Sequence, residues 1–287
     1  MLNESVYVGG QRGKMERIPV AYILGSGHCG STLLNLLLNA HPRMVGLSEL
    51  VSIQNHLRPG QGARLTDQAK WVRIKDRFEQ IAPEGKFEEI DLATPSLRQI
   101  LNSSIPPRWV SDNYGLFRSV LDVMEKDIAV DASKGVKRLM GLEKTGRYDL
   151  RVIHLVRNGR AVVHSYRKKG YSFLSSFRRW FIPAVFNRRL MPAKLLDATL
   201  TVRYEDLCDD PQRVLEAICQ HIGLSYTDDM LAYRDVPYIG VGGNRMGKAT
   251  SVSKISIDER WRQEGRNLDA ILFRLFLGGW VNGRYGY

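Results

Sequence analysis

The segment Val20–Glu49 reads VAYILGSGHCGSTLLNLLLNAHPRMVGLSE and contains three features in a fixed order. A short apolar run ends in Gly25-Ser26-Gly27, the triplet Gly30-Ser31-Thr32 follows, and a leucine-rich stretch without internal Gly or Pro comes last. This order predicts a buried strand, a glycine loop and a helix. Glycines let a ligand approach the backbone, and free N–H groups at a helix start attract negative charge. The segment therefore predicts an anion site.

Two common nucleotide-binding patterns do not fit this loop. The spacing from Gly25 to Thr32 overlays the P-loop frame GxxxxGK[ST], but Ser31 stands where the phosphate-bridging Lys should be. Without that Lys, and without a convincing carboxylate after a later apolar strand, ATP or GTP hydrolysis is poorly supported. A GxGxxG pattern with an acidic residue about 20 positions on is also absent, which disfavours a dinucleotide-binding fold.

The rest of the chain alternates apolar runs with helix-like sequence. The runs that predict buried strands are Ile18–Leu24, Ile128–Asp131, Arg151–Val156 and Thr199–Arg203. Helices are expected at Thr66–Ile81 and Ser111–Glu125, and loops or insertions at Gln54–Arg64 and Pro83–Pro107. Strands that alternate with helices imply a largely parallel sheet covered on both faces. We therefore predict a single α/β domain over residues 1–287, of the P-loop-like three-layer α/β/α type, with residues 1–17 as a flexible lead-in.

Two later segments predict helices of different character. Asp210 and Pro211 provide a cap and a first turn for a scaffold helix that Gly223 ends. The segment Ser172–Leu196 mixes aromatic residues at spacings of three and four with arginines. It is interpreted either as a core-facing helix with a solvated basic side or as a wall or lid over an acceptor pocket, for which contact with a membrane surface is an additional option.

The composition limits the class of protein. The net charge of +12, from 42 Lys+Arg against 30 Asp+Glu, indicates an anionic ligand, an acidic substrate or an anionic surface without choosing among them. Cys29, Cys208 and Cys219 form neither a CxxC pair nor a metal spacing with the six histidines, so no metal is expected. Sparse cysteines favour a reducing compartment, and we expect the cytoplasm. No apolar run approaches the ~18 residues that span a bilayer, and the N-terminus lacks the apolar core of a signal peptide.

A second anion site is predicted where another strand ends. The strand before Arg157 is apolar, and Asn158-Gly159 then turns into a helix that carries Ser165 about two turns later. The carboxyl ends of parallel strands line the crevice in which α/β proteins bind ligands. Two anion sites on neighbouring strand ends suit a ligand that is phosphorylated at two separate places. The alternative is that Arg157 is a structural arginine.

These residues resemble the sulfotransferase superfamily, which uses 3′-phosphoadenylyl sulfate (PAPS) as sulfuryl donor. GSGHCGSTLL resembles its 5′-phosphosulfate loop, and LVRNGRAVVHS resembles its 3′-phosphate motif. LLNAHPRMVGLSEL is similar to the tyrosylprotein sulfotransferase branch and related bacterial sulfotransferases, and VRYEDLCDDPQRVLEAICQHIGL to a scaffold stretch of the superfamily. The resemblance spans about Pro19–Trp261. It implies transfer of a sulfuryl group from PAPS to a hydroxyl-bearing acceptor, with a 3′,5′-bisphosphate as the other product.

The resemblance also implies roles for individual residues. Those expected around the donor are Ser26, Gly27, His28, Cys29, Gly30, Ser31, Thr32, Arg157, Ser165, Asn244 and Arg245. Loop N–H groups and hydroxyls would hold the 5′-phosphosulfate, and Arg157 and Ser165 the 3′-phosphate. Asn244 and Arg245 belong to the Gly-rich, basic segment Tyr238–Ser253, which suits closure over a phosphate. Glu49 would remove the acceptor proton. The alternative is that Glu49 is a structural carboxylate at a helix start.

The sequence departs from the family pattern at His28, where Lys or Arg is usual. A histidine supplies a positive charge only when protonated, so this position implies either a pH-dependent activity or a substitute cation. Lys134, in the stretch VDASKG, is the candidate because family members often have Asp-x-Ser-Lys there. The alternative is that Lys134 is an ordinary exposed lysine.

Two other classes of function stay open. A non-catalytic nucleotide or RNA binder could use the same basic loop, although no RRM or KH signature is present and no specific nucleic acid is expected. A P-loop small-molecule kinase would need the missing Lys. The acceptor, whether a small molecule, a carbohydrate or a peptide, cannot be read from the sequence. Peripheral membrane contact and oligomerisation also stay open.

Overall fold

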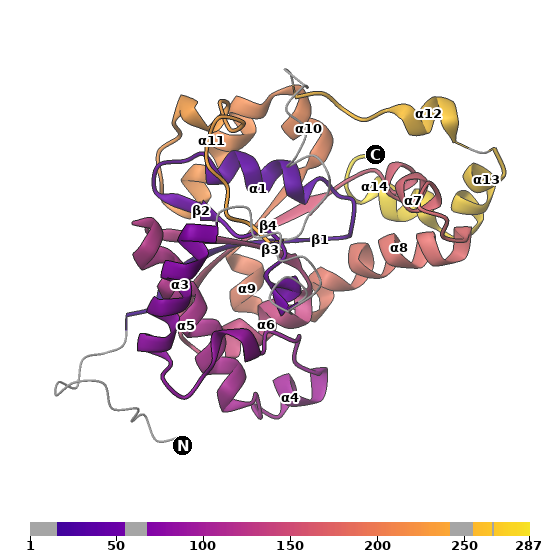
Figure 1. The fold of residues 1–287 in the computed structure, drawn as a ribbon. Helices are drawn as coiled ribbons and strands as arrows, with labels where there is room; N and C mark the ends of the chain where they lie inside the picture. The colour runs from indigo at the N-terminus through magenta and orange to yellow at the C-terminus, as the bar shows by residue number, and fades with distance from the viewer. Residues whose placement is uncertain (1–15, 55–67, 242–254, 266) are drawn as a thin grey trace.

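The computed structural model describes residues 16–54, 68–241, 255–265 and 267–287, and its described strands form one parallel sheet. The strand order is β2-β3-β1-β4-β5 (Figure 1). The strands are β1 (Ile18–Gly25), β2 (Met44–Gly46), β3 (Ile128–Lys134), β4 (Tyr148–Val156) and β5 (Thr199–Arg203). Because β1 lies in the centre, the glycine loop that follows it leaves the middle of the sheet edge. The predicted α/β fold is confirmed.

Helices cover both faces of the sheet. They are α1 (Ser31–Asn39), α3 (Gln68–Ile81), α4 (Leu97–Leu101), α5 (Pro107–Met124), α6 (Val136–Lys144), α7 (Gly159–Arg167), α8 (Phe173–Leu190), α9 (Ala193–Asp197), α10 (Tyr204–Asp209), α11 (Pro211–Ile222), α12 (Arg260–Glu264), α13 (Asn267–Leu275) and α14 (Gly278–Gly283), with short 3₁₀ turns η1 (Leu50–Ser52), η2 (Phe87–Glu89) and η3 (Asp228–Met230). Figure 1 shows α1, α10 and α11 on one face and α3, α5, α6 and α9 on the other. Helices α7, α8, α13 and α14 form a third group beside the sheet.

The alternation of side chains along β1 explains the two layers. Val20, Tyr22 and Leu24 point into the core beneath α3, α5 and α6, whereas Ala21 and Ile23 point into the core beneath α1 and α11. All five are essentially fully buried. A strand that is buried on both faces needs a continuous apolar run, which is why this stretch could be recognised from sequence.

The aromatic segment after α7 belongs mainly to a third core. Phe177 and Trp180 on α8 are buried against Phe273 and Val281 of the C-terminal helices, while Phe186 is exposed. The interpretation as a core-facing helix is therefore confirmed for the first half of α8. Over the described residues, no helix has the length and apolar character needed to cross a membrane.

Two expectations from sequence were incomplete. Strand β2 was not predicted, because its three residues are too few to give a recognisable apolar run. The segment Pro83–Pro107 was predicted as loop or insertion, yet it contains η2 and α4 and places Phe87, Ile90 and Ile100 in the main core. Its Gly and Pro residues do interrupt regular secondary structure, but the apolar residues between them still pack into the main core.

Two helices agree with their predicted signals. Helix α11 begins at Pro211, its cap Asp210 accepts the Arg213 N–H, and Gly223 ends it in the left-handed conformation. Helix α5 starts at Pro107, one turn earlier than predicted, because proline is well suited to the first helical position.

Strand β3 carries a bulge just before it ends. Tyr22 of β1 pairs with Asp131, but Leu24 pairs with Lys134, so β3 advances three residues where β1 advances two. An extra residue bends the strand and changes the direction of the side chain that follows. The side chain affected here is that of Lys134.

Candidate functional site

Backbone strain is concentrated at the carboxyl ends of three adjacent strands. The described part of the chain has six non-glycine residues with positive φ, and three of them are His28, Ser48 and Lys134, with φ of 62°, 56° and 66°. They follow or end β1, β2 and β3 respectively. The left-handed conformation costs an L-residue ~1–2 kcal/mol. Such strain persists where the surrounding structure imposes it, and it clusters at functional sites.

The glycine loop joins β1 to α1 under two tyrosine rings. A Cβ on Gly27 would lie 2.0 Å from the Tyr166 hydroxyl oxygen, and one on Gly30 would lie 2.3 Å from the Tyr204 ring. Gly30 also has φ of 98°, which favours glycine. Gly30 provides no side-chain cap for α1. The loop is thus closely packed from outside, while the first N–H groups of α1 keep their capacity to bind an anion.

The loop side chains do not all face the same way. Cys29 is fully buried in the core beneath α1, and burial raises the pKa of its thiol. Ser26 and Ser31 are buried, whereas Thr32 at the second position of α1 is half-buried. Cys29 can therefore contribute to an anion site only through its backbone.

Arg157 follows β4 and holds the loop from the other side. One terminal nitrogen donates to the His28 carbonyl at 3.1 Å and the other to the Asp258 carbonyl at 3.1 Å. Its guanidinium lies 4.4 Å from the centre of the Tyr204 ring. The side chain is about nine-tenths buried, and its Nε has no partner. A buried guanidinium with an unused donor is the chemistry that an anionic group satisfies.

Helix α7 runs beside the loop. Tyr166 packs edge-on against the His28 ring, with the ring centres 4.5 Å apart. Ser165, its neighbour, is half-buried, and its hydroxyl donates to the Ala161 carbonyl at 2.9 Å. The start of α7 is capped from far along the chain, because Asn282 Oδ1 accepts the Gly159 N–H at 2.9 Å.

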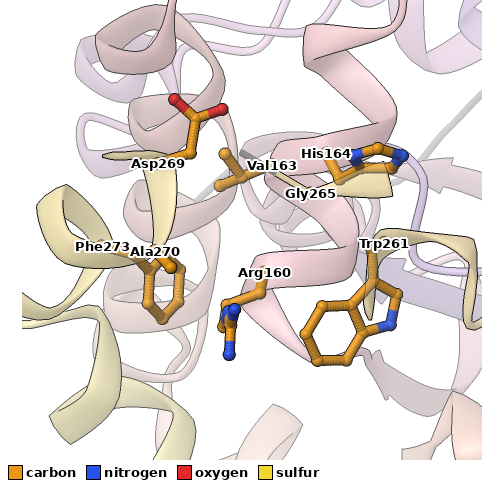
Figure 2. Close-up of a pocket in the computed structure, with 8 residues that line it drawn as sticks. All are labelled: Arg160, Val163, His164, Trp261, Gly265, Asp269, Ala270 and Phe273. Atoms are coloured by element: carbon orange, nitrogen blue, oxygen red, sulfur yellow. The ribbon is translucent and has the colours of Figure 1, made fainter. Parts of the chain in front are cut away.

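A small pocket on the outer side of α7 shows how that helix is braced. Figure 2 shows this pocket between α7 and the segment that contains α12 and α13. The Arg160 guanidinium lies 5.0 Å from the Trp261 ring centre, and Arg167 Nε donates to Asp269 at 3.0 Å. None of the residues predicted for the donor site lines this pocket. Its walls fix α7 in place, so it supports the site without belonging to it.

Glu49 and Lys134 form an ion pair in front of the loop. Lys134 Nζ lies 2.6 Å from Glu49 Oε1 and also donates to the Ala132 carbonyl at 3.2 Å. The Lys134 side chain is 14% exposed, so it is not an ordinary surface lysine, whereas Glu49 is 36% exposed. Glu49 stands before the short turn η1 and makes no side-chain cap there. Glu49 therefore lies at a helix start, as its alternative role as a structural carboxylate requires, but its side chain pairs with Lys134 and makes no capping bond.

The segment Tyr238–Val241 lies beside this ion pair. Glu49 N–H donates to the Val241 carbonyl at 3.1 Å, and Val241 pairs with Ser48 in a parallel bridge. Asn244 and Arg245, predicted from sequence as donor ligands, lie outside the described residues. Among the described residues, no cluster of His, Cys, Asp and Glu could hold a metal ion.

His28 is a neutral imidazole in this environment. Burial, first, and then the positive charges of Lys169, Arg157 and Lys134 together lower the pKa of His28 from 6.5 to about 4, against an opposing effect of Glu49. The loop position where the family usually has Lys or Arg therefore carries no charge near pH 7. Positive charge near the loop comes instead from Lys169, Arg157 and Lys134, and the same charges disfavour protonation of His28. Lys169 was not assigned a role from sequence, although it lies one helical turn after Ser165.

Comparison with known proteins identifies the family and the fold of this chain. Residues 19–228 match the sulfotransferase family, and the chain belongs to that family. The structure is similar to the sulfotransferase domain of the Synechococcus PCC 7002 olefin synthase, with a TM-score of 0.57, 22% identity, and coverage of 96% of this chain and 98% of that one. It is also similar to the sulfotransferase domain from the curacin biosynthetic pathway, with a TM-score of 0.50, 15% identity, and coverage of 91% and 98%. The search of curated proteins found no significant match.

The two structural matches show the shared fold, and the family match defines the enzyme class. The protein is a sulfotransferase-family enzyme. The resemblance inferred from the glycine loop and the Arg157 motif is therefore confirmed at the level of the family.

The packing of Tyr166 on Gly27 gives a test of the loop structure. We expect Gly27→Ala to lower the free energy of unfolding by about 1–3 kcal/mol, because the new methyl group overlaps the tyrosine hydroxyl. Adding Tyr166→Phe should recover most of that loss, since it removes the overlapping atom. Denaturant unfolding of both single variants and the double variant measures the coupling. Additive losses would contradict the contact.

The neutral state of His28 gives a second test. We expect its imidazole to titrate with a pKa near 4 in an NMR titration, because burial disfavours the charged form. Tyr166→Ala exposes the ring and should raise that pKa toward 6.5. A wild-type midpoint at or above 6.5 would show that His28 carries positive charge near neutral pH and is itself the loop cation.

Proposed function

We propose that this chain transfers a sulfuryl group from PAPS to a hydroxyl-bearing acceptor, with Glu49 as the general base. The observation that carries the proposal is the contact of Lys134 Nζ with Glu49 Oε1 at 2.6 Å in front of the glycine loop. It joins a carboxylate, a nearly buried cation and an anion-binding loop at the carboxyl edge of the sheet. This is the set of groups that a metal-free transfer between two oxygens needs.

The residues around the loop fit a donor that carries two separate anionic groups. In the proposal, the N–H groups of Gly27–Thr32 and the hydroxyls of Ser31 and Thr32 hold the 5′-phosphosulfate. Arg157 and Ser165 hold the 3′-phosphate. Two features support the fit: a loop in which Tyr166 and Tyr204 leave no room for side chains on the glycines, and the unpartnered, buried Nε of Arg157. Asn244 and Arg245 are proposed to add ligands.

Catalysis in this proposal depends on position and charge. The donor supplies a sulfuryl group bonded through a bridging oxygen to its 5′-phosphate. Glu49 accepts the acceptor's hydroxyl proton while that oxygen forms its bond to sulfur. Lys134 donates a hydrogen bond to the bridging oxygen as the S–O bond breaks, and the electron pair stays on the departing bisphosphate. Placing such charges in advance is the main source of rate in transfers of this type.

In the absence of a donor, Glu49 and Lys134 are each other's charge partner. Before the donor binds, Lys134 neutralises Glu49, and each charge is satisfied in a partly buried site. When Lys134 turns toward an anionic donor, the Glu49 carboxylate loses that partner and is free to accept the proton of the acceptor hydroxyl. His28, neutral near pH 7, can donate one N–H to the donor without carrying charge. Lys134 is therefore the proposed substitute for the missing loop cation.

We also propose that residues 1–287 act as one catalytic domain in the cytoplasm. Described residues from Ile18 to Val241 contribute to the main core. The three cysteines are buried and unpaired, as expected in a reducing compartment. The acceptor is proposed only as a hydroxyl compound.

One prediction of this proposal concerns Glu49 as the general base. We expect Glu49→Gln to lower kcat by about 10²–10⁴, while the dissociation constant for adenosine 3′,5′-bisphosphate changes by less than about threefold. Transfer of labelled sulfate from PAPS, measured over a panel of hydroxyl acceptors, together with calorimetry of bisphosphate binding, gives both values. Glu143→Gln is the matched control, because Glu143 also faces a lysine, Lys194, at 3.5 Å but lies away from the site. Near-normal transfer by Glu49→Gln would remove Glu49 from this role.

The second prediction concerns the 3′-phosphate. Arg157→Ala should weaken binding of adenosine 3′,5′-bisphosphate by about 10–100-fold, since a charge-assisted bond of about 1.5–3 kcal/mol is lost. Binding of 5′-AMP should change much less. Arg151→Ala, which removes a partly exposed arginine from β4, the strand that Arg157 follows, controls for net charge. Because Arg157 also contacts Tyr204, thermal unfolding must show that the variant is folded. Equal losses for the two nucleotides would exclude a 3′-phosphate site at Arg157.

A further inference from the structure

The turn that ends β3 is held by a buried ion pair that the proposed mechanism does not use. Asp131 and Arg138 are both fully buried, and Arg138 Nε donates to Asp131 Oδ2 at 2.9 Å. The Arg138 guanidinium lies 5.9 Å from the Trp109 ring centre. A buried ion pair of this kind is costly to desolvate, and an apolar pair of similar volume is often as stable. Its position therefore calls for an explanation other than stability.

The other oxygen of Asp131 contacts the bulge. Asp131 Oδ1 accepts the Ser133 N–H at 2.9 Å. Ser133 lies between Asp131 and Lys134, within the stretch where β3 has one residue more than β1. The neighbouring Ala132 N–H donates instead to Ser48 on the β2 side, at 2.8 Å. The carboxylate thus takes the place of a ladder partner for the backbone of the bulge.

Two further bonds close the same turn. Tyr22, paired with Asp131 across the sheet, donates its hydroxyl to the Gly135 carbonyl at 2.9 Å. The Gly135 N–H donates to the Ser133 carbonyl at 2.9 Å. Between these bonds Lys134 is held at φ of 66°, which directs its side chain over its own strand to Ala132 and Glu49. The strained conformation of Lys134 is therefore imposed by its neighbours on both sides.

We propose that Asp131, held in place by Arg138, is a positioning residue that fixes the backbone of Lys134 and so keeps its ammonium within reach of both Glu49 and the donor. Asp131 does not touch the reacting groups. It fixes the Ser133 amide, the Ser133 amide fixes the bulge, and the bulge fixes the backbone conformation of Lys134. This inference rests on the proposed function, because the value of the position of Lys134 depends on its role in sulfuryl transfer.

Two double variants test whether the hydrogen-bond acceptor oxygen of Asp131, and not its negative charge, is what matters. Asp131→Leu combined with Arg138→Met removes the acceptor and leaves no unpaired buried charge, so this double variant should fold. Asp131→Asn combined with Arg138→Gln keeps an oxygen that can accept from Ser133. We expect kcat to fall about 30–100-fold in the apolar double variant and by less than about threefold in the amide double variant. The dissociation constant for adenosine 3′,5′-bisphosphate should stay within about threefold in both.

A matched control removes general instability as the cause. Asp112 is also a buried aspartate that accepts a backbone N–H, that of Asp91 at 2.8 Å, but it lies on α5 away from the strand ends. Asp112→Leu leaves the Asp91 amide and Arg108 without their acceptor, so it should lower the melting temperature at least as much as the apolar double variant does, without a change in kcat. If both lose kcat equally, the role of Asp131 is merely structural and the inference is wrong.

A double-mutant cycle with Lys134 makes the test decisive. In a Lys134→Ala background, the apolar double variant should cause no further loss of kcat, because its effect acts through the missing ammonium. Independent, additive losses would overturn the inference while leaving the proposed function intact. If Lys134→Ala itself keeps normal kcat, the role of Lys134 in the proposed function fails, and with it this inference.

A readout without turnover covers the case in which no acceptor is found. In the wild-type protein, Glu49→Gln should shift the NMR signals of the Lys134 side chain, because the two groups are in contact. In the apolar double variant, the same substitution should leave those signals unchanged. A persistent shift would show that Lys134 keeps its position without Asp131, which would contradict the inference.

Discussion

Backbone groups at the carboxyl edge of a parallel sheet must find partners after the strand ladder ends. At the ends of β2 and β3, nearby residues supply these hydrogen-bond partners. The Ser48 carbonyl accepts the Ala132 N–H, the Val241 carbonyl accepts the Glu49 N–H, and the Asp131 carboxylate accepts the Ser133 N–H. Each of these hydrogen bonds fixes the direction in which the chain leaves a strand. The left-handed conformations of His28, Ser48 and Lys134 are part of the same constraint. The arrangement of the site is therefore a property of the sheet edge as a whole.

Charge at this edge is organised by what surrounds it. Burial and the charges of Lys169, Arg157 and Lys134 lower the pKa of His28, so the positive potential around the loop comes from these three residues and not from His28. Arg157 is stacked on Tyr204 and bonded to two carbonyls, which holds its charge in one place. Fixed charges lose little conformational entropy when an anion binds, and this favours affinity and catalysis.

The sequence allowed much of this site to be predicted, for reasons that can be named. Strands β1, β3, β4 and β5 have apolar runs, and the glycine loop and Arg157 lie directly after two of them. Local spacing is enough for such features. The bulge in β3 could not be predicted, because it depends on the register with β1. The same holds for the contacts of Tyr166 and Tyr204 with the glycines, which join residues more than 130 positions apart. Lys169, which lies in the turn directly after α7 and four positions after Ser165, shows a signal that local spacing contained and that went unused.

The long-range cap on α7 has a consequence for how the protein is made. Helix α7, which packs against the loop, begins at Gly159, and its first amide is bonded to Asn282 near the end of the chain. Likewise, the carbonyl of Asp258 accepts a hydrogen bond from the Arg157 guanidinium. During synthesis, the sheet strands up to β5 can therefore leave the ribosome before Arg157 and the start of α7 have their final partners. Parallel strands and distant contacts fold slowly because loop closure precedes any stabilising contact. The Arg157 guanidinium and the Gly159 amide accordingly reach these hydrogen-bond partners only after residues 258–282 have been synthesised.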